Sequence, residues 1–336
     1  MRLDFTIINK VDGMSIYAKK ILVNIYNSFS DDLFLFYKNF KDGDIINRVK
    51  YVKVDNILQH RLSLGIFDKE FYYSPTHHGP IFNRNKILTV HDITPLILKD
   101  KSFKQYIYYK YFLGTSIQYT KKIITVSEYT KQKLLDNYSL KGREKDILVI
   151  HNATDIDEID ELEVSDLPKK YLFCPGVHSE YKNYKRVIQA FEKLDNTDLN
   201  LVITTNSNEV KNYCKNYDFV KVLFGLEYGQ IKYLYLNSSG LIYPSLIEGF
   251  GFPALEAARL QVPIITTKGS SMEEFLQESA AIYIDPYSVK DISLAIKNLL
   301  NNDLNEMINI AYQNTIELTW EKNAKQVIKI IKDNCE

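Results

Sequence analysis

The sequence predicts an α/β protein built from two domains, each with a parallel β-sheet. Short runs rich in β-branched and aromatic residues alternate with longer amphipathic runs, which is typical of βαβ units. This alternation begins afresh near residue 171. The chain has 336 residues, and a single domain commonly holds roughly 100 to 200. The length therefore allows two hydrophobic cores.

The first half of the chain predicts a Rossmann-like N-terminal domain over residues 1–160. Its candidate strands are Leu3–Ile8, Leu33–Tyr37, Tyr51–Val54, Phe71–Ser74, Ile87–His91, Ile123–Ser127 and Ile147–Asn152. The clearest helical patterns between them are Ser15–Tyr26, Ser102–Gln118 and Glu128–Asn137. Strands that alternate with helices in this way favour a parallel sheet.

The second half predicts another Rossmann-like domain, over residues 168–315. Its candidate strands are Tyr171–Pro175, Leu199–Thr205, Val220–Gly225, Leu241–Pro244, Pro263–Thr267 and Ala281–Asp285. Only helical patterns follow, at Ser288–Leu300, Asp303–Leu318 and Trp320–Ile331. We expect residues 316–336 to form a helix that packs back on the first domain.

A dense acidic segment separates the two halves. It runs from Asp155 to Asp166 and ends just before Pro168. The segment has neither the ligand spacing nor the turn glycine of an EF-hand, which disfavours a cation site. A solvated linker between the domains is the preferred interpretation.

The composition excludes several classes of protein. The chain has 42 Lys and Arg residues against 42 Asp and Glu residues, and 45% of its residues are hydrophobic. This balance argues against a disordered chain and against nucleic-acid binding by bulk charge. Its cysteines, Cys174, Cys214 and Cys335, are far apart and odd in number. They predict neither a disulfide framework nor a cysteine metal cluster, and this cysteine usage indicates a reducing compartment.

We expect a cytoplasmic protein without a transmembrane segment. The chain opens on a strand-like alternation rather than an unbroken apolar region, and the uncharged stretch between Lys232 and Glu248 is too short and too polar to span a bilayer. Zero net charge also disfavours peripheral binding to anionic lipid. A local basic patch around Lys99, Lys101 and Lys104 would be the exception.

The richest local signal is a strand, a glycine loop and a helix at 241–257. Pro253 suits the first helical turn, where no N–H is needed. Gly249 and Gly251 let the backbone approach a ligand closely. Amides at the start of a helix attract phosphates or sugar hydroxyls. The loop therefore predicts a site for an anionic, hydroxyl-rich ligand.

Two carboxylates bracket this loop, Glu248 and, eight residues later, Glu256. An ionised carboxylate only accepts hydrogen bonds, which suits the vicinal hydroxyls of a ribose or hexose. The alternative is that Glu256 is an acid at a helix start, favoured by the helix dipole. Together with the two glycines, the pair favours sugar binding.

Other enzyme classes compete with this interpretation. The residues from Gly249 to Ala254 also fit the G-x-G-x-x-A dinucleotide fingerprint. That fingerprint expects an acid after the next strand, where this chain has Lys268 and Gly269. An NAD(P)-binding enzyme is therefore the weaker alternative. A hydrolase with two catalytic carboxylates from distant positions also stays open.

The segment from Pro244 to Glu256, with its E-x7-E pair, resembles the donor-sugar signature of glycosyltransferase family 4, the retaining GT-B enzymes. Further segments resemble the family in the same order: Thr89–Asp92, Thr125–Glu128, Gly176–Asn183, Phe224–Gly225, Ser271–Glu274 and Ala281–Pro286. The resemblance covers most of the chain and is strongest from Ile242 to Pro286.

The resemblance implies a GT-B architecture, with two Rossmann-like domains facing across a cleft where His91 meets Glu248 and Lys182. It implies retaining transfer of a hexose from a nucleotide-diphosphate sugar to a saccharide or glycan bound by the N-terminal domain. A GDP-linked, mannose- or rhamnose-like donor is favoured. The acceptor attacks on the face that the diphosphate leaves, and no metal or cofactor is required. A sugar-binding relative without turnover is the non-catalytic alternative.

The resemblance also implies roles for individual residues. Glu256 would bind the ribose hydroxyls and Glu248 the transferred hexose. The amides of Gly249, Phe250 and Gly251 would bind the sugar or the diphosphate. Lys182 would neutralise the leaving diphosphate, a task that a metal ion performs in other transferases.

Four further residues are assigned to the donor site by position. His91 would contact the donor sugar, although a lone histidine is by default a core residue. Gly13 would approach the phosphates or the acceptor, unless it only forms a tight turn. Phe224 lies at a later strand end of the nucleotide-binding domain. His178 stands where the family commonly has an arginine, so we expect donor affinity to rise as pH falls toward about 6.5.

The pair His77–His78 lies in a loop that contains proline and glycine. No third ligand stands at a useful spacing, so a metal site is disfavoured. We expect the pair to border the acceptor.

Overall fold

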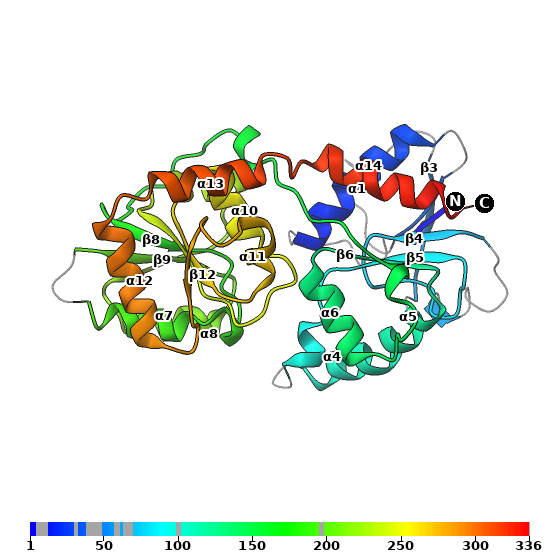
Figure 1. The fold of residues 1–336 in the computed structure, drawn as a ribbon, viewed down its shortest axis with the longest axis horizontal. Helices are drawn as coiled ribbons and strands as arrows, with labels where there is room; N and C mark the ends of the chain where they lie inside the picture. The colour runs from blue at the N-terminus through cyan, green and yellow to red at the C-terminus, as the bar shows by residue number, and fades with distance from the viewer. Residues whose placement is uncertain are drawn as a thin grey trace. The chain divides into compact units, whose positions relative to one another are not determined.

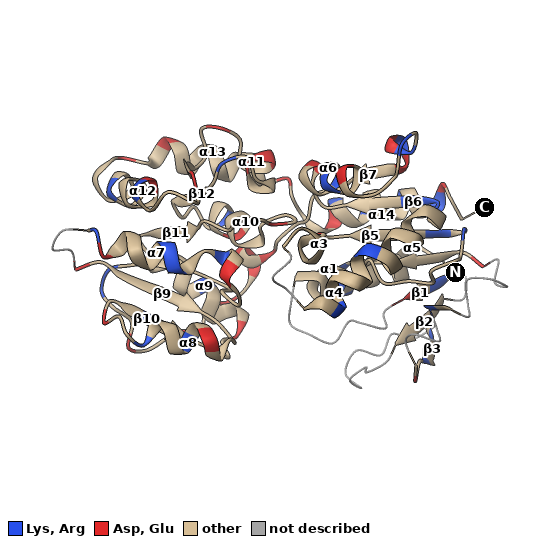
Figure 2. Cartoon of the chain, turned by 90° about the horizontal axis from the view of Figure 1, so that it is seen from below, with Lys and Arg blue, Asp and Glu red and all other residues tan. Residues whose placement is uncertain are grey.

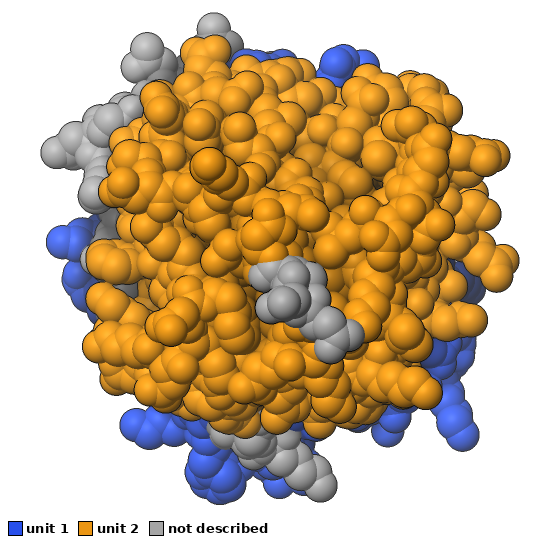
Figure 3. All heavy atoms as spheres, turned by 90° about the vertical axis from the view of Figure 1, so that its left-hand side faces the viewer, with its two compact units in different colours: residues 1–152, 320–336 blue, residues 153–319 orange. Residues whose placement is uncertain are grey.

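A computed structural model of the protein describes residues 1–4, 13–29, 33–37, 49–56, 61–62, 70–98, 102–194 and 198–335. The chain forms two compact units (Figures 1 and 3). Unit 1 comprises residues 1–152 and 320–336, and unit 2 comprises residues 153–319. Each unit contains one sheet, and all strand pairs are parallel. The predicted α/β fold class is thus confirmed.

Unit 1 has a seven-stranded sheet in the order β3-β2-β1-β4-β5-β6-β7. Its strands are β1 (Arg2–Asp4), β2 (Leu33–Tyr37), β3 (Val49–Lys53), β4 (Tyr72–Ser74), β5 (Lys86–Val90), β6 (Lys122–Thr125) and β7 (Ile147–Val149). Every residue of β5 is buried, as expected for a central strand covered on both faces. Residues 5–8 of the first predicted strand lie outside the described residues.

The helices of unit 1 are α1 (Gly13–Ser28), α3 (Thr94–Ile97), α4 (Phe103–Ile107), η2 (Tyr108–Leu113), α5 (Gly114–Tyr119), α6 (Glu128–Asn137) and α14 (Trp320–Lys332), with a 3-10 turn, η3 (Glu144–Asp146). The single helix predicted over residues 102–118 is interrupted, because η2 has the wider π-helical turn. Helix α14 lies beside α1 (Figure 1). There the Trp320 and Tyr17 rings contact each other edge to face, with their centroids 6.2 Å apart.

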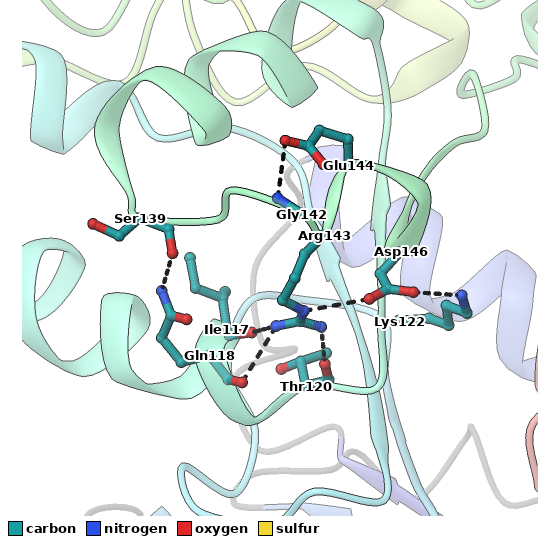
Figure 4. Close-up of polar contacts among 9 residues, drawn as sticks. All are labelled: Ile117, Gln118, Thr120, Lys122, Ser139, Gly142, Arg143, Glu144 and Asp146. Atoms are coloured by element: carbon teal, nitrogen blue, oxygen red, sulfur yellow. Dashed lines mark hydrogen bonds and ion pairs between the residues drawn. The ribbon is translucent and has the colours of Figure 1, made fainter.

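A polar network centred on Arg143 ties the end of α5 to β6 and to η3, the turn before β7 (Figure 4). The Arg143 guanidinium donates to the carbonyl oxygens of Ile117 at 2.8 Å and Thr120, which a helix leaves without intrahelical donors at its end. It also bonds Asp146 at 3.3 Å. Asp146 in turn accepts from Lys122 at 2.7 Å, so one arginine fixes three neighbouring elements.

Unit 2 has a six-stranded sheet in the order β10-β9-β8-β11-β12-β13. Its strands are β8 (Tyr171–Cys174), β9 (Asn200–Thr204), β10 (Val220–Leu223), β11 (Gly240–Tyr243), β12 (Ile264–Thr267) and β13 (Ile282–Ile284). The chain order reverses between β8 and β11. In open parallel sheets, ligands bind beyond the carboxyl ends of the strands at such a point.

The helices of unit 2 are η4 (Ile156–Glu158), η5 (Glu180–Lys182), α7 (Tyr184–Phe191), α8 (Asn208–Cys214), α9 (Tyr228–Leu236), α10 (Phe252–Arg259), α11 (Ser271–Leu276), α12 (Val289–Asn301) and α13 (Asn305–Thr315). One core joins α7 and α12 to the sheet through fully buried side chains such as Val187, Leu201 and Ile296. This packing holds the strand ends and helix starts of unit 2 in a fixed arrangement.

The acidic segment, which we expected to be a solvated linker, has mostly exposed acidic residues. It belongs to unit 2, where Asp157 forms an ion pair with Arg259 of α10. Lys232 of α9 donates to the carbonyl oxygens of Asp157 at 3.0 Å and Ile159 at 2.7 Å. Basic partners from two helices thus attach the segment to the domain, and these partners are distant in the sequence.

Charged residues of both signs are interspersed along both units (Figure 2), in line with the neutral total. Of the expected basic patch, Lys104 is exposed on α4, whereas Lys99 and Lys101 lie outside the described residues. No helix in the described part of the chain is long and apolar enough to cross a membrane.

Candidate active site

The predicted glycine loop joins β11 to α10 in unit 2. Helix α10 begins directly after Gly251, which has a φ of 99°. Pro253 occupies its first turn, where its fixed φ fits and its missing N–H costs nothing. The loop therefore has the strand, glycine turn and helix arrangement that the sequence predicts.

The start of α11 fixes the shape of this loop. The Ser271 hydroxyl lies 3.1 Å from the Glu248 carbonyl oxygen and 3.0 Å from that of Phe250, and it donates to them. A Cβ atom on Gly251 would lie 2.3 Å from Cγ of Met272. Only glycine fits there, because of both the positive φ and this close approach.

Glu248, Lys182 and Tyr243 form a compact polar cluster at the loop. The Lys182 ammonium donates to Glu248 Oε1 at 2.6 Å and also to the Tyr243 hydroxyl. The Tyr243 hydroxyl donates to the same Oε1 at 2.8 Å. Both charged side chains are largely buried, Lys182 being 7% exposed and Glu248 13%. Among the described residues, Glu248 Oε2 makes no hydrogen bond, which leaves it available to a hydroxyl donor.

The burial of Lys182 and the charge of Glu248 act on its pKa in opposite directions. Burial lowers the pKa, but the negative charge of Glu248 and the neighbouring Tyr243 raise it, and the pKa lies well above its ordinary value. Lys182 is therefore an ammonium ion at neutral pH. Such a cation can stabilise negative charge that develops on a ligand.

Asn183 explains how a buried lysine is held at this position. It adopts a left-handed conformation with a φ of 63° between η5 and α7. Its side-chain amide donates to the carbonyl oxygens of Pro244 at 3.1 Å and Pro286 at 2.6 Å. The Lys182–Asn183 turn is thus tied to the ends of β11 and β13, next to the glycine loop.

Glu256 lies in a different environment, with 8% of its surface exposed. Its Oε1 accepts a hydrogen bond from Tyr228 at 2.7 Å and its Oε2 from Tyr235 at 2.8 Å. Burial raises the pKa of Glu256 to about 7, although the two hydrogen bonds lower it. Glu256 is thus balanced between its neutral and charged forms near neutral pH, and it has no cationic partner among the described residues.

The remaining predicted residues of unit 2 differ in exposure. The Phe250 side chain belongs to the core, stacked on Phe275 with ring centroids 4.8 Å apart, so only its backbone can face a ligand. Phe224 is 60% exposed, and the Lys211 ammonium lies 4.4 Å from its ring centroid. His178 is exposed shortly after β8.

His91 and Gly13 belong to unit 1, whereas the residues above belong to unit 2. His91 follows β5 and is 6% exposed. Its Nε2 lies 2.9 Å from the Pro75 carbonyl oxygen, so this nitrogen carries the hydrogen. Gly13 is the first residue of α1, and the preceding residues 5–12 lie outside the described part of the chain.

Sequence reasoning missed the tyrosines of the site. Tyr243 is the last residue of β11, and its role could not be read from the strand pattern. Tyr228 and Tyr235 are seven residues apart on α9. That spacing places both on one helix face, which was the available signal. Among the described residues, no group of three or more His, Cys, Asp or Glu side chains is arranged to hold a metal ion.

Comparisons with known proteins relate this chain to glycosyltransferases. Residues 155–318 match the family described as glycosyl transferases group 1. The O-antigen chain mannosyltransferase RfbU of Salmonella typhimurium is 29% identical over 197 residues, 56% of this chain and 54% of RfbU. The serotype-specific mannosyltransferase WbdA of Escherichia coli is 29% identical over 164 residues, 46% of this chain and 20% of WbdA. The matched segments thus span about half of RfbU and a fifth of WbdA.

Solved glycosyltransferases share the fold over the whole chain. A glycosyltransferase from Rickettsia africae has a TM-score of 0.74 at 16% identity, covering 100% of this chain and 98% of that one. Anabaena HepE, solved in complex with UDP and glucose, has a TM-score of 0.74 at 14% identity, covering 99% and 100%. Residues 155–318 thus form a glycosyltransferase group 1 domain, and the chain as a whole has the two-domain α/β fold of these solved glycosyltransferases, as the sequence predicts.

Proposed function

We propose that the protein is a retaining, metal-independent glycosyltransferase of family 4. It moves a hexose from a nucleotide-diphosphate sugar to a saccharide or glycan acceptor. The observation that carries this proposal is the buried Lys182–Glu248–Tyr243 cluster beside the glycine loop. It combines a fixed cation, a carboxylate oxygen that is free to accept a hydrogen bond, and a loop shaped by glycine.

Each part of the cluster has a role in the proposed reaction. Glu248 Oε2 accepts hydrogen bonds from hydroxyls of the donor sugar. As the bond from the sugar C1 to the diphosphate breaks, the Lys182 ammonium stabilises the charge that grows on the leaving oxygens. The acceptor oxygen bonds to C1 on the same face, and its proton passes to a phosphate oxygen. Lys182 would thus supply the positive charge that a metal ion supplies elsewhere.

The nucleoside end of the donor is assigned to Glu256 and Phe224. The ionised Glu256 carboxylate would accept hydrogen bonds from the ribose hydroxyls, in addition to those from the two tyrosines. Phe224 offers an exposed ring beside Gly225, which has a φ of 67°. The mannosyltransferase relatives support a mannose-like donor sugar, and a GDP-linked donor remains part of the proposal. Because HepE was solved with UDP and glucose, UDP-sugars are the alternative donors to compare with GDP-linked ones.

Nucleotide release from a panel of donors tests the proposal. The protein is mixed with GDP-mannose, GDP-rhamnose, UDP-glucose or dTDP-rhamnose and candidate acceptors, with and without a chelator. We expect release of nucleoside diphosphate from one donor, unchanged by the chelator, and a product with the anomeric configuration of the donor by NMR. Binding without release from any donor would instead favour a sugar-binding protein. An inverted product would exclude the retaining mechanism.

Substitutions at the cluster test the residue roles in the same assay. Lys182→Ala should lower turnover by about a hundredfold or more, as expected for the loss of a group that stabilises developing charge. Glu248→Gln should also lower turnover strongly, because it replaces the charged acceptor of the sugar hydroxyls with a neutral amide. Lys185→Ala is the matched control, because this neighbouring lysine has a side chain that is 38% exposed and that pairs with Glu180. Near-normal turnover in a folded Lys182→Ala or Glu248→Gln protein would remove the assigned roles.

A further inference from the structure

A second polar cluster lies in unit 1, outside the site described above. It is formed by Arg61, His77, His78 and Tyr108. The two histidines follow β4, and the sheet of unit 1 reverses its chain order between β1 and β4. The cluster therefore lies beyond the carboxyl end of a strand at the switch point, where open parallel sheets bind ligands.

Arg61 is the unusual member of this cluster. It is 7% exposed, yet its Nε and Nη2 atoms are buried without a hydrogen-bond partner among the described residues. Its guanidinium carbon lies 5.6 Å from the ring centroid of Tyr108, and its carbonyl oxygen accepts from the Ile81 N–H at 2.9 Å. Nε and Nη2 form one edge of the guanidinium, the edge that binds carboxylate or phosphate with two parallel hydrogen bonds.

The histidine pair lies next to this arginine. The rings of His77 and His78 are 3.9 Å apart between centroids. His78 Nδ1 is 2.7 Å from the Tyr108 hydroxyl. His77 Nδ1 is also buried without a partner in the described part of the chain. The cluster thus contains three buried nitrogen atoms, two on Arg61 and one on His77, that lack hydrogen-bond partners.

The charge of the cluster is not balanced. Burial, together with the electrostatic influence of His91 and Arg61, lowers the pKa of His77 to about 3. The pKa of His78 is also well below its usual value, chiefly through burial. Both imidazoles are therefore neutral, and Arg61 carries the positive charge. Asp4 is close enough to raise the pKa of Tyr108, but it forms no ion pair with Arg61.

We propose that Arg61 and His77 form an oxyanion site in unit 1 that binds the negatively charged group of the acceptor, a phosphate or a sugar carboxylate. A buried guanidinium without an acceptor is costly, and a bound oxyanion supplies the missing acceptors on the Nε–Nη2 edge. His77 Nδ1 offers a further contact through its neutral ring. The assignment to the acceptor rests on the proposed glycosyltransferase function, whereas oxyanion binding itself does not.

Equilibrium binding to the full-length protein tests the site without any turnover. Inorganic phosphate and glucuronate are the probes, measured by calorimetry in a buffer free of other oxyanions. Arg61→Gln should weaken binding by about tenfold or more, because it removes the charged edge. Arg61→Lys should be intermediate, since it keeps the charge and loses the fork. Arg84→Gln is the matched control, because Arg84 is exposed and lies over the Tyr119 ring in the same unit.

The two probes distinguish the two chemical groups, phosphate and carboxylate, that could carry the negative charge of the acceptor. Preferential binding of phosphate supports a phosphorylated acceptor, and preferential binding of glucuronate supports an acidic sugar. Lys182→Ala locates the binding, because phosphate held in unit 2 would be lost in that variant. Loss in Lys182→Ala with no change in Arg61→Gln, or no binding of either probe, overturns the proposal. A protein that binds phosphate through Arg61 but transfers no sugar would overturn only the proposed function.

Thermal unfolding gives an independent check. In anion-free buffer, Arg61→Gln should melt at the same temperature as the wild type or higher, because it removes an unpaired buried charge. Adding phosphate should raise the melting temperature of the wild type and leave that of the variant unchanged. A clearly lower melting temperature of the variant without anion would show that Arg61 is a structural residue and would overturn the proposal.

Discussion

The two glutamates of the glycine loop occupy contrasting environments. Glu248 has a cationic partner in Lys182, whereas Glu256 is buried between two tyrosine hydroxyls. The sequence places both acids around a loop, and the E-x7-E spacing carries the resemblance. The spacing could not predict the environments of the two acids, since Lys182 and the tyrosines of α9 come from distant segments.

The raised pKa of Glu256 predicts that it destabilises the protein at high pH. In the unfolded chain its pKa is near 4.5 and in the folded protein about 7. Between these values the folded protein binds more protons, so stability falls as pH rises. From about pH 4 to about pH 8, the unfolding free energy of Glu256→Gln should therefore gain about 3 kcal/mol relative to the wild type.

Urea unfolding at several pH values measures this gain. Glu306→Gln, at an exposed position of α13, controls for the substitution. A constant difference between Glu256→Gln and the wild type would contradict the raised pKa. Donor binding offers a second readout: affinity should rise through about pH 7 if the Glu256 carboxylate binds the ribose, and it should fall if His178 is the dominant phosphate partner. Calorimetry with Glu256→Gln separates the two trends.

At the scale of elements, the sequence predicts the bounds of an element well where local chemistry sets them. Ser127 accepts from the Thr130 N–H and starts α6 at Glu128, so this helix has the predicted bounds. The π-helical turn in the α4–α5 region was not predicted, because hydrophobic periodicity alone does not distinguish it from an α-helix. The attachment of the acidic segment to unit 2 depends on contacts with α9 and α10, which no local pattern records.

The junction between the glycine loop and α11 predicts a large cost for a single methyl group. Gly251→Ala would combine a positive φ with a clash against Met272. We expect a loss of about 2 to 5 kcal/mol in unfolding free energy, from backbone strain and overpacking together. Urea unfolding measures this loss.

Gly269→Ala is the matched control for this substitution. Gly269 has a φ of 69° with nothing within 4 Å of the added methyl group, so it should lose only about 1 to 2 kcal/mol from strain. Adding Met272→Ala to Gly251→Ala should relieve the clash and so restore part of the unfolding free energy that Gly251→Ala loses. Equal losses at Gly251 and Gly269 would show that Met272 does not restrict the loop.

At the scale of the whole molecule, unit 1 depends on a helix that is distant in the sequence. Trp320 of α14 is buried against Tyr17 of α1. Trp320→Ala should destabilise unit 1 by about 3 to 5 kcal/mol, the usual cost of removing a buried tryptophan side chain. Hydrogen exchange resolved by peptide should show faster exchange in the strands of unit 1 and little change in unit 2.

Lys325→Ala is the control on the same helix, because its side chain is 72% exposed and pairs only with Glu321. It should change stability by less than about 0.5 kcal/mol. Equal acceleration of exchange in both units after Trp320→Ala would contradict the division at residues 152–153 and 319–320. The two parallel sheets were predicted from the repeated strand pattern, whereas these boundaries depend on which side chains α14 covers.

The position of unit 2 inside the sequence of unit 1 has a consequence for biosynthesis. A ribosome that adds roughly 5 to 20 residues per second completes all of unit 2 between making α1 and making α14. The apolar face of α1, with Tyr17 and Ile21, then waits for tens of seconds, about 15 to 60 s, before its covering helix is made. At the end of this interval the nascent chain holds a complete second domain and an incomplete first one, in which a hydrophobic helix face is still uncovered.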